Sequence, residues 1–207
     1  MLLLAEQKVL LFTFIHVIRT VKAIAIFASG EGTNARVIIE HFKNHPDIRV
    51  ALVLTNNPSA GVIKLAQSNK IISAIVSKHF FQQQQSIESI LNALNIELIV
   101  LAGFLQLVPA YLIQKFPNRI INIHPALLPK FGGKGMYGKK VHEAVLAANE
   151  SETGITVHYV NEVYDEGEII LQAKTPVTLQ DTPSSLAEKV QQLEHKFYVK
   201  AITQVLG

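Results

Sequence analysis

The sequence predicts a single-domain α/β protein built on a doubly wound, mostly parallel sheet of the Rossmann-like kind. The chain of 207 residues is 49% hydrophobic and 17% charged, with a mean hydropathy of +0.27. This composition is typical of a fold with a large core and excludes a disordered chain. Short continuous apolar runs also alternate with helical patterns, as in parallel sheets that are covered by helices on both faces.

The first half of the chain is expected to alternate strands and helices without interruption. An apolar run that starts at Lys22 leads into a glycine turn at Gly30 and forms the first strand. The further strands expected here are 49–56, 73–76, 97–103 and 119–125, and the helices are 34–43, 60–69, 86–94 and 109–116. This alternation predicts that the first half of the sheet is parallel.

The second half is expected to hold a helix over 141–148, two strands over 154–160 and 168–177, and a closing amphipathic helix over 183–205. Because no domain linker interrupts these patterns, residues 21–207 are predicted to form one domain.

Residues 1–20 precede the first strand and form an apolar extension. Glu6 and Lys8 cancel the positive charge that a signal peptide needs, and the apolar stretch 9–15 is too short to span a bilayer. We expect a cytoplasmic protein, without a membrane partner, in which residues 1–20 are dispensable. The alternative is an N-terminal hydrophobic helix that docks on a partner.

Composition excludes several kinds of site. The chain has no cysteine, which excludes a disulfide scaffold, a thiolate zinc site and a cysteine nucleophile. The histidines lack the spacing of metal ligands, so no metal is expected. The net charge is +3, but the basic residues are scattered rather than gathered in a stripe, so we expect no nucleic-acid partner. The charge also suits small anionic substrates.

The first chemical motif is the segment Ser29-Gly30-Glu31-Gly32-Thr33-Asn34-Ala35, between the first strand and the first helix. Glycines let a backbone approach an anion, and the amides of a helix N-terminus point at it. A dinucleotide site also needs a carboxylate about 20 residues later, where this chain has Thr55, Asn56 and Asn57. We therefore predict a phosphate-binding loop; a simple tight turn is the alternative.

The second motif is Asn122-Ile123-His124-Pro125, at the end of a predicted strand. Side chains two residues apart share one face of a strand, and Pro125 ends the pairing at the carboxyl edge, where ligands bind in such sheets. An amide donor beside an imidazole suits a carbonyl that gains negative charge. The alternative is a buried polar pair with a structural role.

Asp165 lies in an acidic turn between the last two strands. Such turns are usually only solvated. Asp165 becomes chemically important if the fold brings it to His124, because a carboxylate would then favour the imidazolium form.

Taken together, the motifs ASGEGTN, LAGFLQLVP, NIHPALLPKFGG, TGITVHYV, YDEGEIILQ and QQLEHKFY resemble those of the phosphoribosylglycinamide formyltransferase family, the folate-dependent transformylases of purine biosynthesis. The resemblance covers residues 22–205, and the motifs occur in the same order as in the family. It implies transfer of a formyl group from 10-formyltetrahydrofolate, as co-substrate, to the amine of 5′-phosphoribosylglycinamide, without a metal.

The resemblance also implies roles for individual residues. The catalytic trio would be Asn122, His124 and Asp165. The ribonucleotide would be held by Gly32, Thr33, Asn34, Gln191 and Glu194. The folate would contact Asn122 and two loops, which comprise Leu105, Gln106, Leu107 and Val108, and Asn161, Glu162, Val163, Tyr164 and Asp165.

Three features depart from the family's pattern. Gln106 stands where relatives often have arginine, Glu31 puts a carboxylate in the proposed phosphate loop, and the segment 132–140 is longer than expected. This segment is interpreted as a flexible loop, and a basic flap over an anion is the alternative.

Other functions remain open at this point. The enzyme could formylate a different amine, on an amino-sugar nucleotide or on methionyl-tRNA, or the chain could be a non-catalytic nucleotide-binding homologue. The oligomeric state is unknown.

Overall fold

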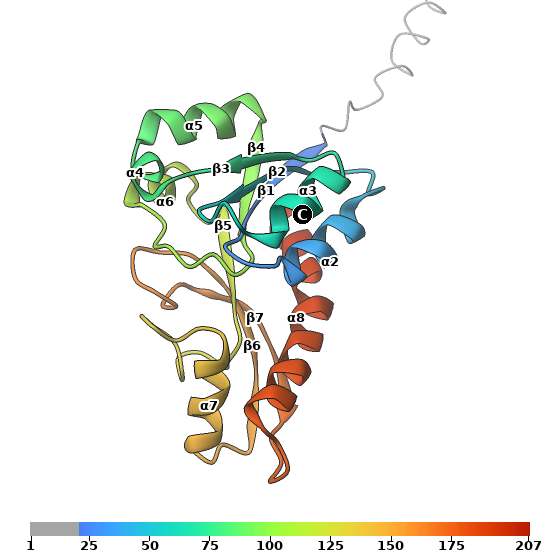
Figure 1. The fold of residues 1–207 in the computed structure, drawn as a ribbon, viewed down its shortest axis with the longest axis vertical. Coiled ribbons are helices and arrows are strands. Elements are labelled where there is room, and N and C mark those ends of the chain that lie inside the picture. The colour runs from blue at the N-terminus through green and yellow to red at the C-terminus, as the bar shows by residue number, and fades with distance from the viewer. Residues whose placement is uncertain (1–20) are drawn as a thin grey trace, which may run out of the picture.

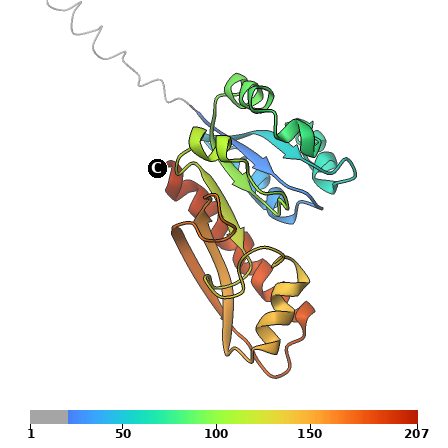
Figure 2. The same cartoon turned by 90° about the vertical axis from the view of Figure 1, so that its left-hand side faces the viewer.

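A computed structural model describes residues 21–207, which form a seven-stranded sheet (Figures 1 and 2). The strand order is β3-β2-β1-β4-β5-β6-β7. The first five strands in this order pair in parallel, whereas the β5–β6 and β6–β7 pairings are antiparallel. The strands are β1 Lys22–Phe27, β2 Ile48–Thr55, β3 Ile72–Ile75, β4 Ile96–Leu101, β5 Ile120–His124, β6 Glu152–Tyr159 and β7 Ile169–Pro176.

Helices cover both faces of the sheet. They are α2 Thr33–Phe42, α3 Gly61–Ser68, α4 Lys78–Phe81, α5 Gln84–Ala93, α6 Ala110–Lys115, α7 Lys139–Ala147 and α8 Pro183–Leu206. Figure 1 shows the long α8 extending from α7 to α2. This helix therefore borders both the parallel and the antiparallel parts of the sheet.

Successive side chains of β1 point to opposite faces of the sheet, and the core accordingly has two layers. Ile24 and Ile26 pack with buried residues of α2, α3 and α8, whereas Ala23, Ala25 and Phe27 pack with those of α4, α5 and α6. Strands β1, β2 and β4 are therefore buried on both faces, which explains their continuous apolar sequences.

A buried tyrosine fixes α8 against the sheet. The hydroxyl of Tyr198 contacts the carbonyl oxygens of Leu101, at 2.8 Å, and Ile121, at 3.2 Å. Leu101 is the last residue of β4, and Ile121 lies on the neighbouring strand β5. One face of α8 is thereby held beside the strand ends at which a ligand would bind.

The structure confirms the predicted fold class, with the expected strands and helices displaced by one or two residues at their ends. It adds the four-residue helix α4, which is too short to show a period in the sequence. Ser77 caps this helix by accepting a hydrogen bond from the Phe80 amide.

The prediction that residues 1–20 are dispensable lies outside the described residues. Within residues 21–207, no helix is both long and apolar enough to span a membrane.

Candidate active site

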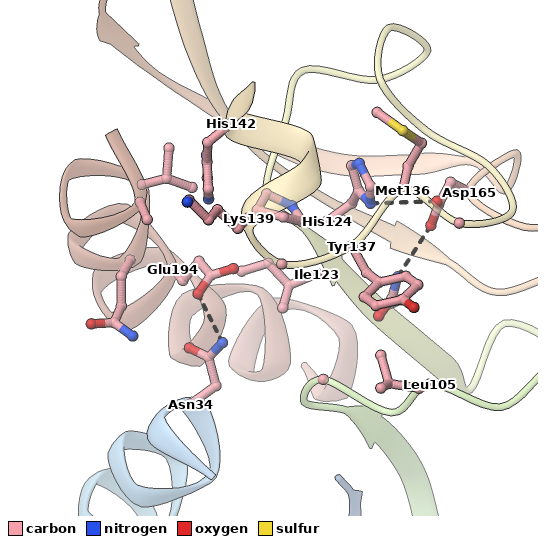
Figure 3. A pocket seen from close by; sticks show the side chains of 18 of the residues that line it. Asn34, Leu105, Ile123, His124, Met136, Tyr137, Lys139, His142, Asp165 and Glu194 are labelled. Atoms are coloured by element: carbon pink, nitrogen blue, oxygen red, sulfur yellow. Dashed lines mark hydrogen bonds and ion pairs between the residues drawn. The ribbon is translucent and has the colours of Figure 1, made fainter. Parts of the chain in front are cut away.

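A pocket with a volume of about 850 Å³ opens at the carboxyl ends of β4 and β5 (Figure 3). The strand order reverses between β1 and β4, and ligands of doubly wound proteins bind at such a switch point. Of the residues predicted to be functional, eight line the pocket: Asn34, Leu105, Asn122, His124, Tyr164, Asp165, Gln191 and Glu194.

The three predicted catalytic residues meet in this pocket. Asn122 and His124 lie on β5 two residues apart and therefore share a face. His124 Nδ1 is 3.4 Å from Asp165 Oδ2, and Asn122 Nδ2 donates to Asp165 Oδ1 at 3.4 Å. Figure 3 shows the contact between His124 and Asp165. The fold thus brings the acidic turn to the Asn-His pair, as the sequence interpretation required.

Asp165 is held in position by its backbone and by a neighbouring loop. Its φ of +59° is in the left-handed region, which Asp and Asn tolerate better than other non-glycine residues. Gly133 N–H donates to Oδ2 at 2.9 Å. Burial alone would raise the pKa of Asp165, but hydrogen bonding to His158 and the nearby His124 hold this pKa below its usual value. Asp165 is therefore an anion at neutral pH.

His124 is oriented by contacts at both ring nitrogens. Its Nε2 lies 2.7 Å from the Phe131 carbonyl oxygen, which can only accept, so Nε2 carries a proton. The other nitrogen, Nδ1, faces Asp165. Burial lowers the pKa of His124, and Asp165 acts in the opposite direction. The pair is therefore arranged so that a second proton on Nδ1 would meet a carboxylate.

His158 is part of this site, although the sequence did not single it out. In the antiparallel pairing of β5 and β6, it lies opposite Asn122. Its Nδ1 donates to the Tyr159 carbonyl at 2.8 Å, and its Nε2 lies 3.2 Å from Asn122 Nδ2 and 3.6 Å from Asp165 Oδ1. His158 thus lies against both the Asn122 amide and the Asp165 carboxylate. Only the strand register, which is not visible in the sequence, could have identified it.

The glycine loop lies at the other end of the pocket. Gly32 is the N-cap of α2 with φ +79°, and a side chain there would collide with Val62, so the position requires glycine. Asn34 Nδ2 donates to Glu194 Oε2 at 3.0 Å. Gln191 Nε2 is 3.5 Å from Thr33 Oγ1. The predicted ribonucleotide residues of α2 and α8 are therefore adjacent, although about 160 residues separate them in sequence.

The carboxylate of Glu31 does not point into this loop. A side chain on Gly61 would collide with Glu31 Oε2, which shows that the carboxylate lies against the first residue of α3. The positive end of a helix stabilises a carboxylate. Glu31 is thus placed where its charge is favourable for α3.

Burial raises the pKa of Glu194 to about 7, and the hydrogen bond from Asn34 opposes this shift. A carboxyl whose pKa is higher in the folded than in the unfolded chain stabilises the fold below the unfolded pKa, and this contribution is lost as pH rises through the folded value. Glu194→Gln keeps an acceptor for Asn34 but cannot ionise. We expect this variant to be more stable than wild type at pH 8, by up to about 3 kcal/mol.

Urea unfolding at pH 4.5, 6 and 8 measures this difference in the free energy of unfolding. The increase in the free energy of unfolding of Glu194→Gln over wild type should be small at pH 4.5 and grow towards pH 8. Glu188→Gln, an exposed carboxylate on the same helix, is the control and should show no such trend. A constant difference across the pH range would contradict the prediction.

Several predicted folate residues border the pocket without lining it. Leu107 and Val163 are exposed, and Val108 is buried in the core with α5 and α6. The Oε1 atom of Gln106 is buried without a hydrogen-bond partner. Asn161 and Glu162 are also absent from the lining, as are Gly32 and Thr33 of the predicted ribonucleotide site. The predicted folate contacts therefore stay a prediction, supported by Leu105, Asn122, Tyr164 and Asp165.

Ser29 joins the two loops that were assigned to different substrates. Its N–H donates to the Gly103 carbonyl at 3.0 Å, and its hydroxyl accepts from the Leu105 amide at 3.1 Å. The same hydroxyl donates to Asn56 at 2.6 Å. The start of the glycine loop and the segment after β4 are thus fixed to each other.

The segment 132–140, interpreted from sequence as a flexible loop, borders the site. Residues 133–139 all line the pocket, among them Lys134 and Lys139. The carbonyl of Phe131 and the amide of Gly133 contact His124 and Asp165. This placement favours the alternative interpretation, a basic segment against the ligand site.

Within residues 21–207, no group of three or more His, Asp or Glu side chains is arranged to hold a metal ion. The absence of a metal from the reaction stays a prediction.

Comparison with known proteins gives a consistent result. The family model described as formyl transferase matches residues 22–202. The chain is 41% identical over 187 residues to phosphoribosylglycinamide formyltransferase, chloroplastic, from Arabidopsis thaliana, covering 87% of the chain and 64% of the relative. It is 37% identical over 191 residues to phosphoribosylglycinamide formyltransferase from Bacillus subtilis, covering 90% and 95%.

Comparison with solved structures gives the same result. Glycinamide ribonucleotide transformylase 1 from Geobacillus kaustophilus superposes with a TM-score of 0.81 at 34% identity, covering 90% of the chain and 100% of that structure. The chain spans less than two thirds of the length of two chloroplastic relatives, 64% of the Arabidopsis thaliana protein and 60% of the phosphoribosylglycinamide formyltransferase of Vigna unguiculata.

Proposed function

The chain belongs to the formyl transferase family, and we propose that it transfers the formyl group of 10-formyltetrahydrofolate to the amine of 5′-phosphoribosylglycinamide, a step of purine biosynthesis in one-carbon metabolism. The observation that carries this proposal is the contact of Asn122, His124 and Asp165 at the floor of one pocket. Gly32, Asn34 and Glu194 at its other end support a ribonucleotide as the acceptor.

In the proposed reaction, the amine of the ribonucleotide adds to the formyl carbon, and negative charge develops on the formyl oxygen. Asn122 and protonated His124 would each turn one N–H from its present acceptor, Asp165 or the Phe131 carbonyl, to this oxygen, because donors held at the reacting atom stabilise charge that appears in the transition state. Asp165 would favour the imidazolium form of His124 and orient a water. This water would carry the proton from the attacking amine to the nitrogen that leaves.

The ribonucleotide would lie along α2 and α8. The backbone amides of Gly32, Thr33 and Asn34 would bind its phosphate at the N-terminus of α2. Glu194 would accept hydrogen bonds from the ribose hydroxyls, with Gln191 beside it. Ionised Glu194 accepts at both oxygens, so the affinity for the ribonucleotide is expected to rise as pH increases through about 7.

The folate supplies the formyl group and would occupy the side of the pocket near Leu105 and Tyr164. The exposed apolar side chains of Leu105 and Val163 suit a flat aromatic ring. These features fit a pterin, to which the loops 105–108 and 161–165 would contribute backbone contacts.

One assay tests the proposal directly: formyl transfer from 10-formyltetrahydrofolate to glycinamide ribonucleotide. Methionyl-tRNA and an amino-sugar nucleotide serve as alternative acceptors. Turnover with the ribonucleotide alone is expected. Preference for another acceptor, or folate binding without turnover, would overturn the assignment.

The phosphate loop offers a matched pair of glycines for a specific prediction. Gly32→Ala forces a side chain into a left-handed position against Val62, at a cost of about 1–3 kcal/mol. The loop should relax away from the phosphate and raise KM for the ribonucleotide about tenfold or more, with KM for the folate nearly unchanged.

Gly30→Ala is the control, because nothing lies within 4 Å of a side chain added there. Steady-state kinetics with each substrate varied in turn makes the comparison. An equal increase in both KM values for Gly32→Ala would indicate a general folding defect and contradict the assignment of the loop.

The N-terminal segment and the compartment are also proposals. We propose that residues 1–20 are dispensable for a domain formed by residues 21–207, and that the protein acts in the cytoplasm on small-molecule substrates. A protein that begins with methionine before Val21 should match the full-length chain in activity and melting temperature. Loss of folding or activity in the short form, or membrane association of the long form on fractionation, would refute this.

A further inference from the structure

His124 has an acceptor at each of its ring nitrogens. Nε2 lies 2.7 Å from the carbonyl oxygen of Phe131, and Nδ1 lies 3.4 Å from Asp165 Oδ2 (Figure 3). A neutral imidazole has a proton on one nitrogen and a lone pair on the other. Either neutral form therefore turns a lone pair towards an oxygen, and only the imidazolium donates at both nitrogens. The Phe131 carbonyl and the Asp165 carboxylate thus favour the same charged form.

The Phe131 carbonyl reaches His124 through an uncommon backbone conformation. Phe131 has φ +58°, in the left-handed region, which is unfavourable for a residue with a bulky side chain. The other described non-glycine residues with positive φ are three asparagines, a lysine and Asp165. Both residues that contact the ring nitrogens therefore have this conformation. Such strain persists only where the surrounding structure holds it, and it concentrates at functional sites.

Contacts on both sides hold the backbone around Phe131. Before it, the Leu128 amide donates to Thr156 Oγ1 on β6 at 3.0 Å. After it, the Gly133 amide donates to Asp165 Oδ2 at 2.9 Å. The segment is thereby fixed to strand β6 at one end and to the catalytic carboxylate at the other, which keeps the carbonyl between them in place.

We propose that Phe131 is a positioning residue for formyl transfer, whose left-handed backbone directs its carbonyl oxygen to His124 Nε2 and so gives the imidazolium an acceptor at both nitrogens. This role rests on the proposed function, in which protonated His124 donates to the formyl oxygen. When the formyl group is bound, Nε2–H turns from the carbonyl to the formyl oxygen, and Nδ1–H stays on Asp165. Only the acceptor of one hydrogen bond is exchanged, so no proton is gained or lost in this step.

The titratable groups that face His124 are Asp165, His158 on β6 and His142 on α7. Burial lowers the pKa of His124 most, Asp165 and the Phe131 carbonyl raise it, and His158 lowers it. His124 in turn lowers the pKa of His142, so the two rings disfavour each other's charge. Without the carbonyl contact, burial and the two histidines would be opposed by Asp165 alone. His124 should then lose its second proton at lower pH.

Substitutions at position 131 change the backbone conformation without removing a hydrogen bond, because the Phe131 amide donates to no group within residues 21–207. Phe131→Pro fixes φ at about −65°, and Phe131→Val disfavours the left-handed region. Phe131→Asn loses the aromatic ring but tolerates this region. Asn118→Val is the matched control, since Asn118 is exposed, precedes β5 and has φ +53°.

NMR titration of the full-length protein measures the proposed effect, with the His124 signal assigned by its loss in His124→Ala. We expect the midpoint of this signal to move down by about one pH unit in Phe131→Pro, and in the same direction in Phe131→Val. Phe131→Asn and Asn118→Val should titrate as wild type. The falling limb of the kcat profile should move with the midpoint.

A wild-type midpoint in folded Phe131→Pro, as verified by thermal unfolding, would overturn the proposal, and Phe131→Val decides in the same way if the proline variant does not fold. An equal decrease in Phe131→Asn would also overturn it, because the effect would then come from the aromatic ring. The titration does not depend on formyl transfer. Wild-type protein without turnover on the ribonucleotide would therefore contradict the proposed function and not the contact between Phe131 and His124.

Discussion

Asp165→Asn is expected to lower turnover about 1,000-fold or more, the effect that loss of a buried carboxylate has on a histidine that it orients. The amide keeps the shape of the side chain and, like aspartate, tolerates the φ of +59° at this position. What it removes is the negative charge 3.4 Å from His124 Nδ1. Alanine would add backbone strain and is therefore a poorer probe.

The same variant has a signature in the pH profile. Asp165 raises the pKa of His124 against the effect of burial, so the loss of its charge lowers that pKa further. The residual activity should therefore depend on a protonated histidine at lower pH than in wild type, and the falling limb of the kcat profile should move to lower pH. Glu166→Gln, an exposed carboxylate in the same turn, is the control. Turnover close to wild type in Asp165→Asn would refute the role.

Asn122→Ala is expected to lower turnover about 100- to 1,000-fold, as removal of one oxyanion donor does. His124→Ala should cost about 100- to 10,000-fold through loss of an acid–base group. The double variant should lose far less than the product of the two effects, because both side chains serve one transition state.

Single-turnover kinetics with both substrates saturating measures these effects, and thermal unfolding verifies the fold. His79→Ala, an exposed histidine, is the control. Fully multiplicative losses in the double variant would contradict a shared role, and near-normal turnover in either single variant would exclude that residue from the chemistry.

The sequence predicts well those elements in which burial determines the residue type at each position. The alternation of β1 and the apolar runs of β2 and β4 follow from burial on both sides, so the sheet was predictable. Helix α4 was not, since four residues hold a single turn and no period. The paired motif of Asn122 and His124 was predictable because both lie on one strand.

The rest of the site depends on contacts between distant segments. His158 lies in an apolar strand, and only its register opposite Asn122 gives it a role. His142 and Lys139 line the pocket because α7 packs beside α8. The raised pKa of Glu194 results from burial against neighbouring elements, which no local pattern encodes.

The hydrogen bonds of Ser29 have a thermodynamic consequence for the two substrates. One hydroxyl and one amide fix the glycine loop to Gly103 and Leu105, so neither loop can shift without disturbing the other. A ligand that orders one loop therefore lowers the entropic cost of ordering the second loop when the other ligand binds. Such a coupling free energy is reciprocal: by whatever factor the ribonucleotide changes the affinity for the folate, the folate changes the affinity for the ribonucleotide.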